Sequence, residues 1–160
     1  MAIVKFESEL EVLHINDLDL EDQVICKAAT KAMKNAYAIY SNFQVGSALL
    51  LDNGEIVTGS NQENAVYPLT LCAERVAIFA ASHQYPNASI LKLAVATSHE
   101  EKGEEIPVFP CGSCRQVINE QEDRRSNSIE VFIVGSDEKV YKMASIKAIL
   151  PFAFKKSDLK

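Results

Sequence analysis

The chain has 160 residues, of which 48% are hydrophobic, so it is long enough for one domain with a single core and too apolar for a disordered tail. Its 16 basic and 22 acidic residues give a net charge of −6, which argues against a nucleic-acid partner because such binding needs a clustered basic surface. The sequence has neither a run of roughly 18 apolar residues that could span a membrane nor a secretory signal. We therefore expect a cytoplasmic protein with no membrane partner.

The first half of the chain predicts an arm, a helix and a hairpin. Residues 1–16 alternate only weakly between apolar and polar side chains and are interpreted as an N-terminal arm. Residues 16–40 carry apolar side chains at helical spacing, after acidic residues that suit a helix start. Residues 45–61 contain two apolar runs around a turn sequence at 52–54 that favours positive φ, which predicts a β-hairpin.

The second half of the chain alternates helices and strands around one charged segment. The acidic segment 99–106 is interpreted as a solvated loop. In chain order, the expected elements are a helix at 71–82, a strand at 90–98, a helix from 111 to about 121, a hairpin at 129–143 and a short terminal helix. The helix at 71–82 has few polar positions, so we expect it to be buried.

This order of elements predicts an α/β fold. Strands separated by helices favour a partly parallel sheet with right-handed crossovers, and the two hairpins make the sheet mixed. We expect a three-layer αβα sandwich with a mixed five-stranded sheet, formed by a single domain over residues 1–160. The N-terminal arm, residues 1–16, is assigned no function.

Three of the four cysteines lie at the starts of two predicted helices, which indicates a metal site. Cysteines that stay reduced in the cytosol are more often ligands or catalytic groups than disulfide partners. Cys111 and Cys114 are three residues apart and therefore face the same side of a helix, whose dipole favours thiolates at its start. Cys72 would supply a third sulfur, and the histidines are scattered elsewhere in the sequence. Three thiolates without an obvious fourth ligand are typical of an open, catalytic zinc site.

Glu74 follows Cys72 by two residues and could serve the same metal. Both side chains can reach it only if Cys72 lies at the non-helical entry of the helix and Glu74 lies in the first turn. A glutamate so placed can accept a proton from a metal-activated water and deliver it to a leaving group. Arg75 or Arg115 could offset the excess negative charge of three thiolates by donating to the sulfurs. The alternative interpretation of Glu74 is an ordinary first-turn acid that the helix dipole stabilises.

The sequences CAE at 72–74 and PCxxC at 110–114 together resemble the signature of the zinc-dependent nucleoside deaminases. Longer blocks resemble, in order, those of the small homotetrameric cytidine deaminases: "YSNFQVGSALL", "NQENAVYPLTLCAERVAIF", "PCGSCRQV" and "ILPFAF". The resemblance covers most of residues 20–154, and it implies the cytidine deaminase-like fold in a homotetramer. It also implies one Zn²⁺ per chain and Glu74 as the catalytic proton shuttle. The zinc ligands would be Cys72, Cys111 and Cys114.

The activity implied by the resemblance is hydrolytic deamination of cytidine and 2′-deoxycytidine to uridine and 2′-deoxyuridine, with release of ammonia, in pyrimidine salvage. By the same resemblance, Asn61 and Glu63 bind the sugar 3′-hydroxyl, and Phe43 packs against the pyrimidine. The backbone of Ala73 hydrogen-bonds the ring, and Phe154 enters the active site of a neighbouring subunit. Asn61 and Glu63 are two residues apart in an extended segment, so we expect their side chains on the same side.

Other interpretations stay open on the sequence alone. The C-x-x-C spacing by itself also fits a redox pair or half of a structural zinc ribbon. A non-catalytic zinc module would close its site with a fourth protein ligand, and a deaminase of blasticidin or RNA would share the metal motif. Glu63 could be a solvated acid, and Phe43 and Phe154 could be core residues. Cys26 is interpreted as a buried apolar residue rather than a ligand.

Overall fold

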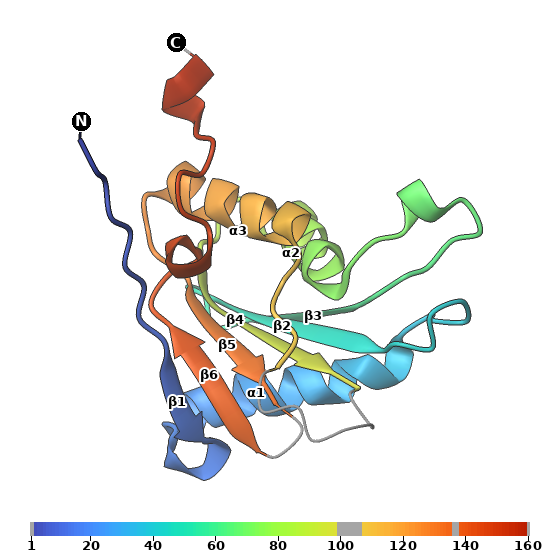
Figure 1. Ribbon diagram of the computed structural model, residues 1–160. Helices are drawn as coiled ribbons and strands as arrows, with labels where there is room; N and C mark the ends of the chain where they lie inside the picture. Colours follow the sequence, from blue (N-terminus) through green and yellow to red (C-terminus); the bar gives the residue numbers. More distant parts are fainter. Residues whose placement is uncertain (1, 99–106, 136–137, 160) are drawn as a thin grey trace.

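Six strands form one sheet in the part of the chain that the structure describes. The computed structural model describes residues 2–98, 107–135 and 138–159, so the acidic segment 99–106 and two residues of the second predicted turn lie outside it. The order of strands in the sheet is β1-β6-β5-β4-β2-β3 (Figure 1). The strands are β1 (Glu11–His14), β2 (Val45–Leu51), β3 (Ile56–Ser60), β4 (Ile90–Thr97), β5 (Glu130–Val134) and β6 (Lys139–Met143).

Helices cover both faces of this sheet. The α-helices of the described residues are α1 (Leu20–Ala32), α2 (Ala73–Gln84) and α3 (Gly112–Arg125). α1 lies on one face, and α2 and α3 lie on the other (Figure 1). Side chains of β4 alternate between the two apolar clusters, because Leu93 and Val95 pack on the side of α2 and α3 whereas Ala94 and Ala96 pack on the side of α1. None of these described helices is long and apolar enough to span a bilayer.

The sheet is mixed, as the sequence predicts. β2 and β3 form the first hairpin, with Gly54 at a φ of 84° in the turn, and β5 and β6 form the second. β2 also pairs antiparallel with β4. β4 and β5 run parallel and are connected through α3. A parallel pair needs such a crossover, and this one carries the C-x-x-C motif.

The expected five-stranded sheet is wrong by one strand, because part of the N-terminal arm forms β1. β1 pairs antiparallel with β6, from Glu11 opposite Lys142 to His14 opposite Lys139. It is an edge strand, and Leu13 is its one partly buried residue. Since both faces of β1 are largely exposed, its sequence lacks the apolar alternation that a buried face imposes.

The first helix is shorter than the predicted range 16–40, because α1 gives way to a 3₁₀ turn. Beyond that turn the chain pairs with the segment after β3, where the Tyr37 amide donates to the Asn61 carbonyl at 3.0 Å. This pairing joins distant segments, so helical periodicity cannot reveal where the helix ends. The predicted short terminal helix is a 3₁₀ turn at Ile146–Ile149, and a further 3₁₀ turn at Lys156–Leu159 was not predicted.

Cys26 is buried, as expected from the sequence. It lies in α1 with no exposed surface and belongs to the apolar cluster on that face of the sheet. Burial raises the pKa of its thiol to about 12, and the neighbouring Asp22 carboxylate adds to the shift. Its environment is therefore that of a core residue, on the opposite face of the sheet from α2 and α3.

Candidate metal centre and pocket

The start of α2 brings Cys72 and Glu74 to one place. Cys72 precedes the helix with extended backbone angles, φ −70° and ψ 153°, while Glu74 lies in the first turn. A close approach to Gly59 of β3 positions this turn, because a Cβ on Gly59 would lie 2.6 Å from the Ala73 carbonyl oxygen and 2.5 Å from the Ala77 amide nitrogen. The α2 backbone therefore rests directly on β3, which only glycine allows.

The start of α3 is built in the same way. Cys111 precedes the helix with extended backbone angles, φ −65° and ψ 164°, and Cys114 is fully buried in the first turn. Arg115 holds this turn by donating from Nε to the Pro110 carbonyl at 2.7 Å and from Nη1 to the Ile149 carbonyl at 2.8 Å. The Arg115 guanidinium therefore binds backbone oxygens rather than the cysteine sulfurs considered for it on the sequence.

The sulfurs of Cys72, Cys111 and Cys114 meet between the two helix starts. Their Sγ atoms all lie within 4.8 Å of one another, and those of Cys72 and Cys111 are 3.9 Å apart. Tetrahedral zinc with Zn–S bonds of about 2.3 Å separates its sulfurs by about 3.8 Å, so the cluster fits one zinc ion. Among the described residues no fourth protein ligand joins the group, which leaves one tetrahedral position for a water or a substrate.

Arg75 brings positive charge to the sulfur cluster. Its Nη2 donates to the Cys72 sulfur and to the Thr70 carbonyl, both at 3.4 Å. A hydrogen bond from Cys114, together with the Arg75 guanidinium, holds the pKa of Cys72 well below its usual value. The same hydrogen bond and burial raise the pKa of Cys114. The Arg75 guanidinium therefore favours the thiolate form of Cys72.

Glu74 is a buried acid beside this cluster. The residue is only 4% exposed, and it lines the same cavity as Cys72 and Cys111. Burial raises the pKa of its carboxyl, and the charge on Cys72 adds to the shift. A buried carboxyl with a raised pKa, beside the cysteine cluster, suits the transfer of protons to and from a bound molecule.

The cavity beside the cysteine cluster has a volume of about 230 Å³. Three of the residues that the family resemblance assigned to the substrate line it, namely Phe43, Asn61 and Glu63. In the described part of the chain its lining includes two glutamates and no lysine or arginine. The cavity is therefore polar at the cysteine cluster and at the Asn61–Glu63 wall, and its described lining offers no positive side chain.

Four further residues that line this cavity were not predicted from the sequence. Val95 and Thr97 come from the end of β4, and Val108 and Phe109 come from the segment directly before the second cysteine motif. Their closeness to that motif in the sequence is a signal that could have identified Val108 and Phe109. Val95 and Thr97 had no such signal, because an alternating strand does not reveal which of its faces meets a cavity.

Asn61 anchors the chain segment that carries Phe43. Its Oδ1 accepts from the Val45 amide at 2.8 Å, and its Nδ2 donates to the Phe43 carbonyl at 2.9 Å. The side chain thus bridges two backbone groups of the neighbouring segment, in addition to lining the cavity.

Glu63 anchors the same segment two residues earlier. Its carboxylate accepts from the amides of Tyr40 and Ser41, at 2.8 and 3.2 Å, and from the Ser41 hydroxyl. The hydroxyl bond holds the pKa of Glu63 below its usual value. These bonds therefore favour the carboxylate form of Glu63, which lines the cavity.

The other assigned residues lie outside the cavity lining in the described part of the chain. Ala73 is fully buried in the first turn of α2, and Arg75 reaches the Cys72 sulfur from outside the cavity. Phe154 lies in the C-terminal segment and is 57% exposed. Its carbonyl accepts a hydrogen bond from Gln116 Nε2 of α3 at 2.9 Å.

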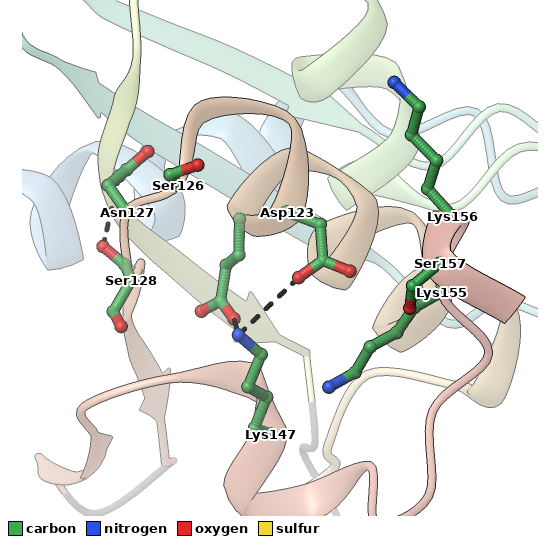
Figure 2. Close-up of a pocket in the computed structure, with 9 residues that line it drawn as sticks. Asp123, Ser126, Asn127, Ser128, Lys147, Lys155, Lys156 and Ser157 are labelled. Atoms are coloured by element: carbon green, nitrogen blue, oxygen red, sulfur yellow. Dashed lines mark hydrogen bonds and ion pairs between the residues drawn. The ribbon is translucent and has the colours of Figure 1, made fainter.

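A second, larger cavity lies at the C-terminal end of α3. It measures about 420 Å³ and is lined by two acids of α3, polar residues of the following loop, and lysines and a serine from the C-terminal part of the chain (Figure 2). Lys147 points at the carboxylates of Glu122 and Asp123, at 3.6 and 3.7 Å. Glu122 also accepts from the amides of Ile129 and Ile146, at 3.0 and 3.3 Å. We interpret these groups as structural, because their charges are paired and they join α3 to the end of the chain.

Most of this chain is similar in sequence to known proteins. Residues 20–129 match the family model described as "Cytidine and deoxycytidylate deaminase zinc-binding region". The chain belongs to this family. The match includes both cysteine motifs and Glu74, whereas the N-terminal arm and Phe154 lie outside it.

Named cytidine deaminases are similar to the chain over nearly their whole length. The cytidine deaminase of Halalkalibacterium halodurans is 35% identical over 148 residues, which cover 88% of this chain and 98% of the relative. That of Sporosarcina psychrophila is 40% identical over 129 residues, which cover 81% of this chain and 88% of the relative. The crystal structure of cytidine deaminase from Burkholderia pseudomallei has a TM-score of 0.68 at 36% identity, over 82% of this chain and 97% of that chain.

Proposed function

We propose that this protein hydrolyses cytidine and 2′-deoxycytidine to uridine and 2′-deoxyuridine, with release of ammonia, in cytoplasmic pyrimidine salvage. The observation that carries the proposal is the buried carboxyl of Glu74, which lines one cavity with Cys72 and Cys111 of the three-sulfur cluster. Cytidine deaminases that are 35% and 40% identical support it. The missing fourth ligand among the described residues favours this function over a structural zinc module, whose site would be closed.

The residues of the site divide the chemistry between them. Cys72, Cys111 and Cys114 hold zinc, which when bound supplies Lewis-acid chemistry by lowering the pKa of water. Glu74 accepts a proton from the attacking water, passes it to N3 of the cytosine ring and later helps to protonate the leaving group. The water oxygen forms a bond to C4 and the bond from C4 to the amino nitrogen breaks, so one water is consumed and one ammonia is released.

The cavity walls favour a neutral nucleoside over a nucleotide. Phe43, Asn61 and Glu63 line the cavity; we expect Phe43 to offer an aromatic surface to the pyrimidine, and Asn61 and Glu63 to bind the ribose hydroxyls. The described lining has two glutamates and no cationic side chain, so a 5′-phosphate would meet like charge without a counterion. We expect kcat/KM for cytidine to exceed that for cytidine 5′-monophosphate by about 100-fold or more; equal values would contradict this specificity.

We further propose a homotetramer in which Phe154 completes the cavity of a neighbouring subunit. Phe154 is exposed and lies outside the cavity lining of its own chain. Further exposed side chains lie beside this cavity, because Tyr40 and Tyr67, whose rings pack edge to face with centroids 6.0 Å apart, share an adjoining pocket with Glu63. Exposed apolar surface of this kind marks an interaction site, and a second copy of the chain would cover it.

The test of the catalytic assignment is an assay with zinc analysis. The purified protein is expected to bind about one zinc per chain and to remove the cytidine absorbance band. Glu74→Gln should keep its zinc and lower kcat by about 10²- to 10⁴-fold. Glu55→Gln, which changes an exposed acid in the first hairpin, is the matched control and should keep full activity. A Glu74→Gln enzyme with the original kcat would overturn the proposed role of Glu74.

A further inference from the structure

The N-terminal arm runs beside the C-terminal segment 149–154, which we call the tail. β1 pairs antiparallel with β6, and Glu11 lies opposite Lys142. The residues before Glu11 and those after Met143 therefore leave the sheet at the same end. The arm and the tail rise from the same end of the sheet (Figure 1). There Phe6 of the arm meets Phe152 of the tail, with ring centroids 6.4 Å apart and ring planes at 49°. A cavity of about 480 Å³ is lined by Phe6 together with tail residues, so the arm and the tail share one surface.

On its other side the tail is held by α3. Arg115 Nη1 donates to the Ile149 carbonyl at 2.8 Å, and Gln116 Nε2 donates to the Phe154 carbonyl at 2.9 Å. Between these two bonds Phe152 has a φ of 56°, a left-handed conformation that aromatic residues seldom adopt. Such a conformation persists only where the surroundings hold it, and the arm contacts this residue.

We propose that the arm is a strap: Phe6 holds Phe152 and thereby positions Phe154 to complete the cavity of a neighbouring subunit. The inference rests on the proposed function, since it concerns how Phe154 is placed in the substrate site of a neighbouring subunit. Neither Phe6 nor Phe152 lines the catalytic cavity in the described part of the chain, so both are positioning residues. Phe6 is 47% exposed and Phe152 is 83% exposed, so neither belongs to the core and removing their contact leaves the core of the domain intact.

The first measurement follows amide hydrogen exchange in peptides that cover the tail, in the full-length zinc-loaded protein. Phe6→Ala is expected to speed exchange at residues 149–154 by about 3- to 10-fold, the effect of losing one aromatic pair. Ile3→Ala is the matched control, because Ile3 belongs to the same arm and is 81% exposed; it should leave this exchange unchanged. Unchanged exchange in Phe6→Ala would overturn the strap.

The second measurement is the kinetics of cytidine deamination. Phe6→Ala and Phe152→Ala are each expected to raise KM by about 3- to 10-fold, with zinc content and oligomeric state unchanged. The double variant should add little to either single change, because all three remove the same contact. Phe6→Tyr keeps an aromatic ring and should restore most of the affinity. A purely structural role would lower the amount of folded enzyme and leave KM unchanged.

The two readouts separate the strap from the proposed function. If Phe154→Ala raises KM while Phe6→Ala does not, the tail acts without the strap and the inference is wrong. Faster tail exchange in Phe6→Ala with an unchanged KM also overturns it, because the arm would then hold the tail without positioning Phe154. If the wild-type protein does not deaminate cytidine, the proposed function fails and the positioning role fails with it, whereas hydrogen exchange still decides whether the arm holds the tail.

Discussion

Glu74 differs from an ordinary first-turn glutamate because it is buried. A first-turn acid is usually exposed and is stabilised by the helix dipole, an alternative that the sequence alone leaves open. In the structure Glu74 is 4% exposed and shares a cavity with two of the clustered cysteines. Its place in the first turn could be predicted from its spacing to Cys72. Its burial could not, because burial depends on segments that pack over the helix start from elsewhere in the chain.

For Asn61 and Glu63, too, the local placement could be predicted from the sequence, whereas the contacts with distant segments could not. Their spacing of two residues predicts that both side chains face one side, and both line the cavity. Their hydrogen bonds to the segment around Phe43 were not predicted, because Asn61 and Val45 are 16 residues apart and Glu63 and Tyr40 are 23 apart. No local pattern in a sequence reports such a contact.

Replacing Asn61 tests its role as an anchor. Asn61→Ala leaves the Val45 amide without its acceptor, so we expect the free energy of unfolding to fall by about 1–3 kcal/mol. KM for cytidine should rise as well, because the segment that carries Phe43 loses its tether. Urea unfolding and steady-state kinetics measure the two effects. Asn53→Ala removes a comparable bond to the Glu55 amide in an exposed turn and should leave KM unchanged; equal KM values in the two variants would argue against the anchor.

At the scale of elements, the position of α2 depends on one glycine. We predict that Gly59→Ala pushes α2 away from β3, because the new Cβ would lie within 2.6 Å of the helix backbone at Ala73 and Ala77. The free energy of unfolding should fall by about 1–3 kcal/mol, and zinc content should fall with it since Cys72 moves with the helix. Gly112→Ala is the matched control, because nothing lies within 4 Å of a Cβ at that position, and it should be stable in the same urea titration. An unchanged urea midpoint for Gly59→Ala would contradict the close approach.

α1 is attached to the sheet by charge as well as by apolar packing. The Asp22 side chain is 3% exposed and pairs with Lys92 of β4 and, at 3.5 Å, with Lys142 of β6. Asp22→Asn removes the shared anion, so we predict a loss of about 1.5–3 kcal/mol in the free energy of unfolding at fixed protein concentration. Glu21→Gln removes an exposed partner of the same Lys92, 2.7 Å away, and should cost less than about 1 kcal/mol. Similar losses in both variants would show that burial of Asp22 contributes nothing.

At the scale of the whole molecule, the site as seen in one chain lacks Phe154. Mixing two defective proteins tests whether a neighbour supplies it. Glu74→Gln and Phe154→Ala subunits, unfolded and refolded together, should recover deamination well above that of either protein refolded alone. A mixed assembly contains cavities with an intact Glu74 from one subunit and an intact Phe154 from the other. Recovery no greater than the average of the two separate proteins would indicate that Phe154 acts within its own chain.

The sequence by itself determined where the residues of the candidate site lie within their elements, and it determined most of those elements. Spacings within a turn are local, so three sulfurs at two helix starts, the acid beside one of them and both hairpins follow from residues that are close in the chain. Tertiary structure decided what depends on distant partners. These features are the additional strand β1, the early end of α1, the burial of Glu74, the contact between Phe6 and Phe152, and the walls of the cavity. The physical reason is that burial and strand pairing are properties of surfaces that meet only after the chain has folded.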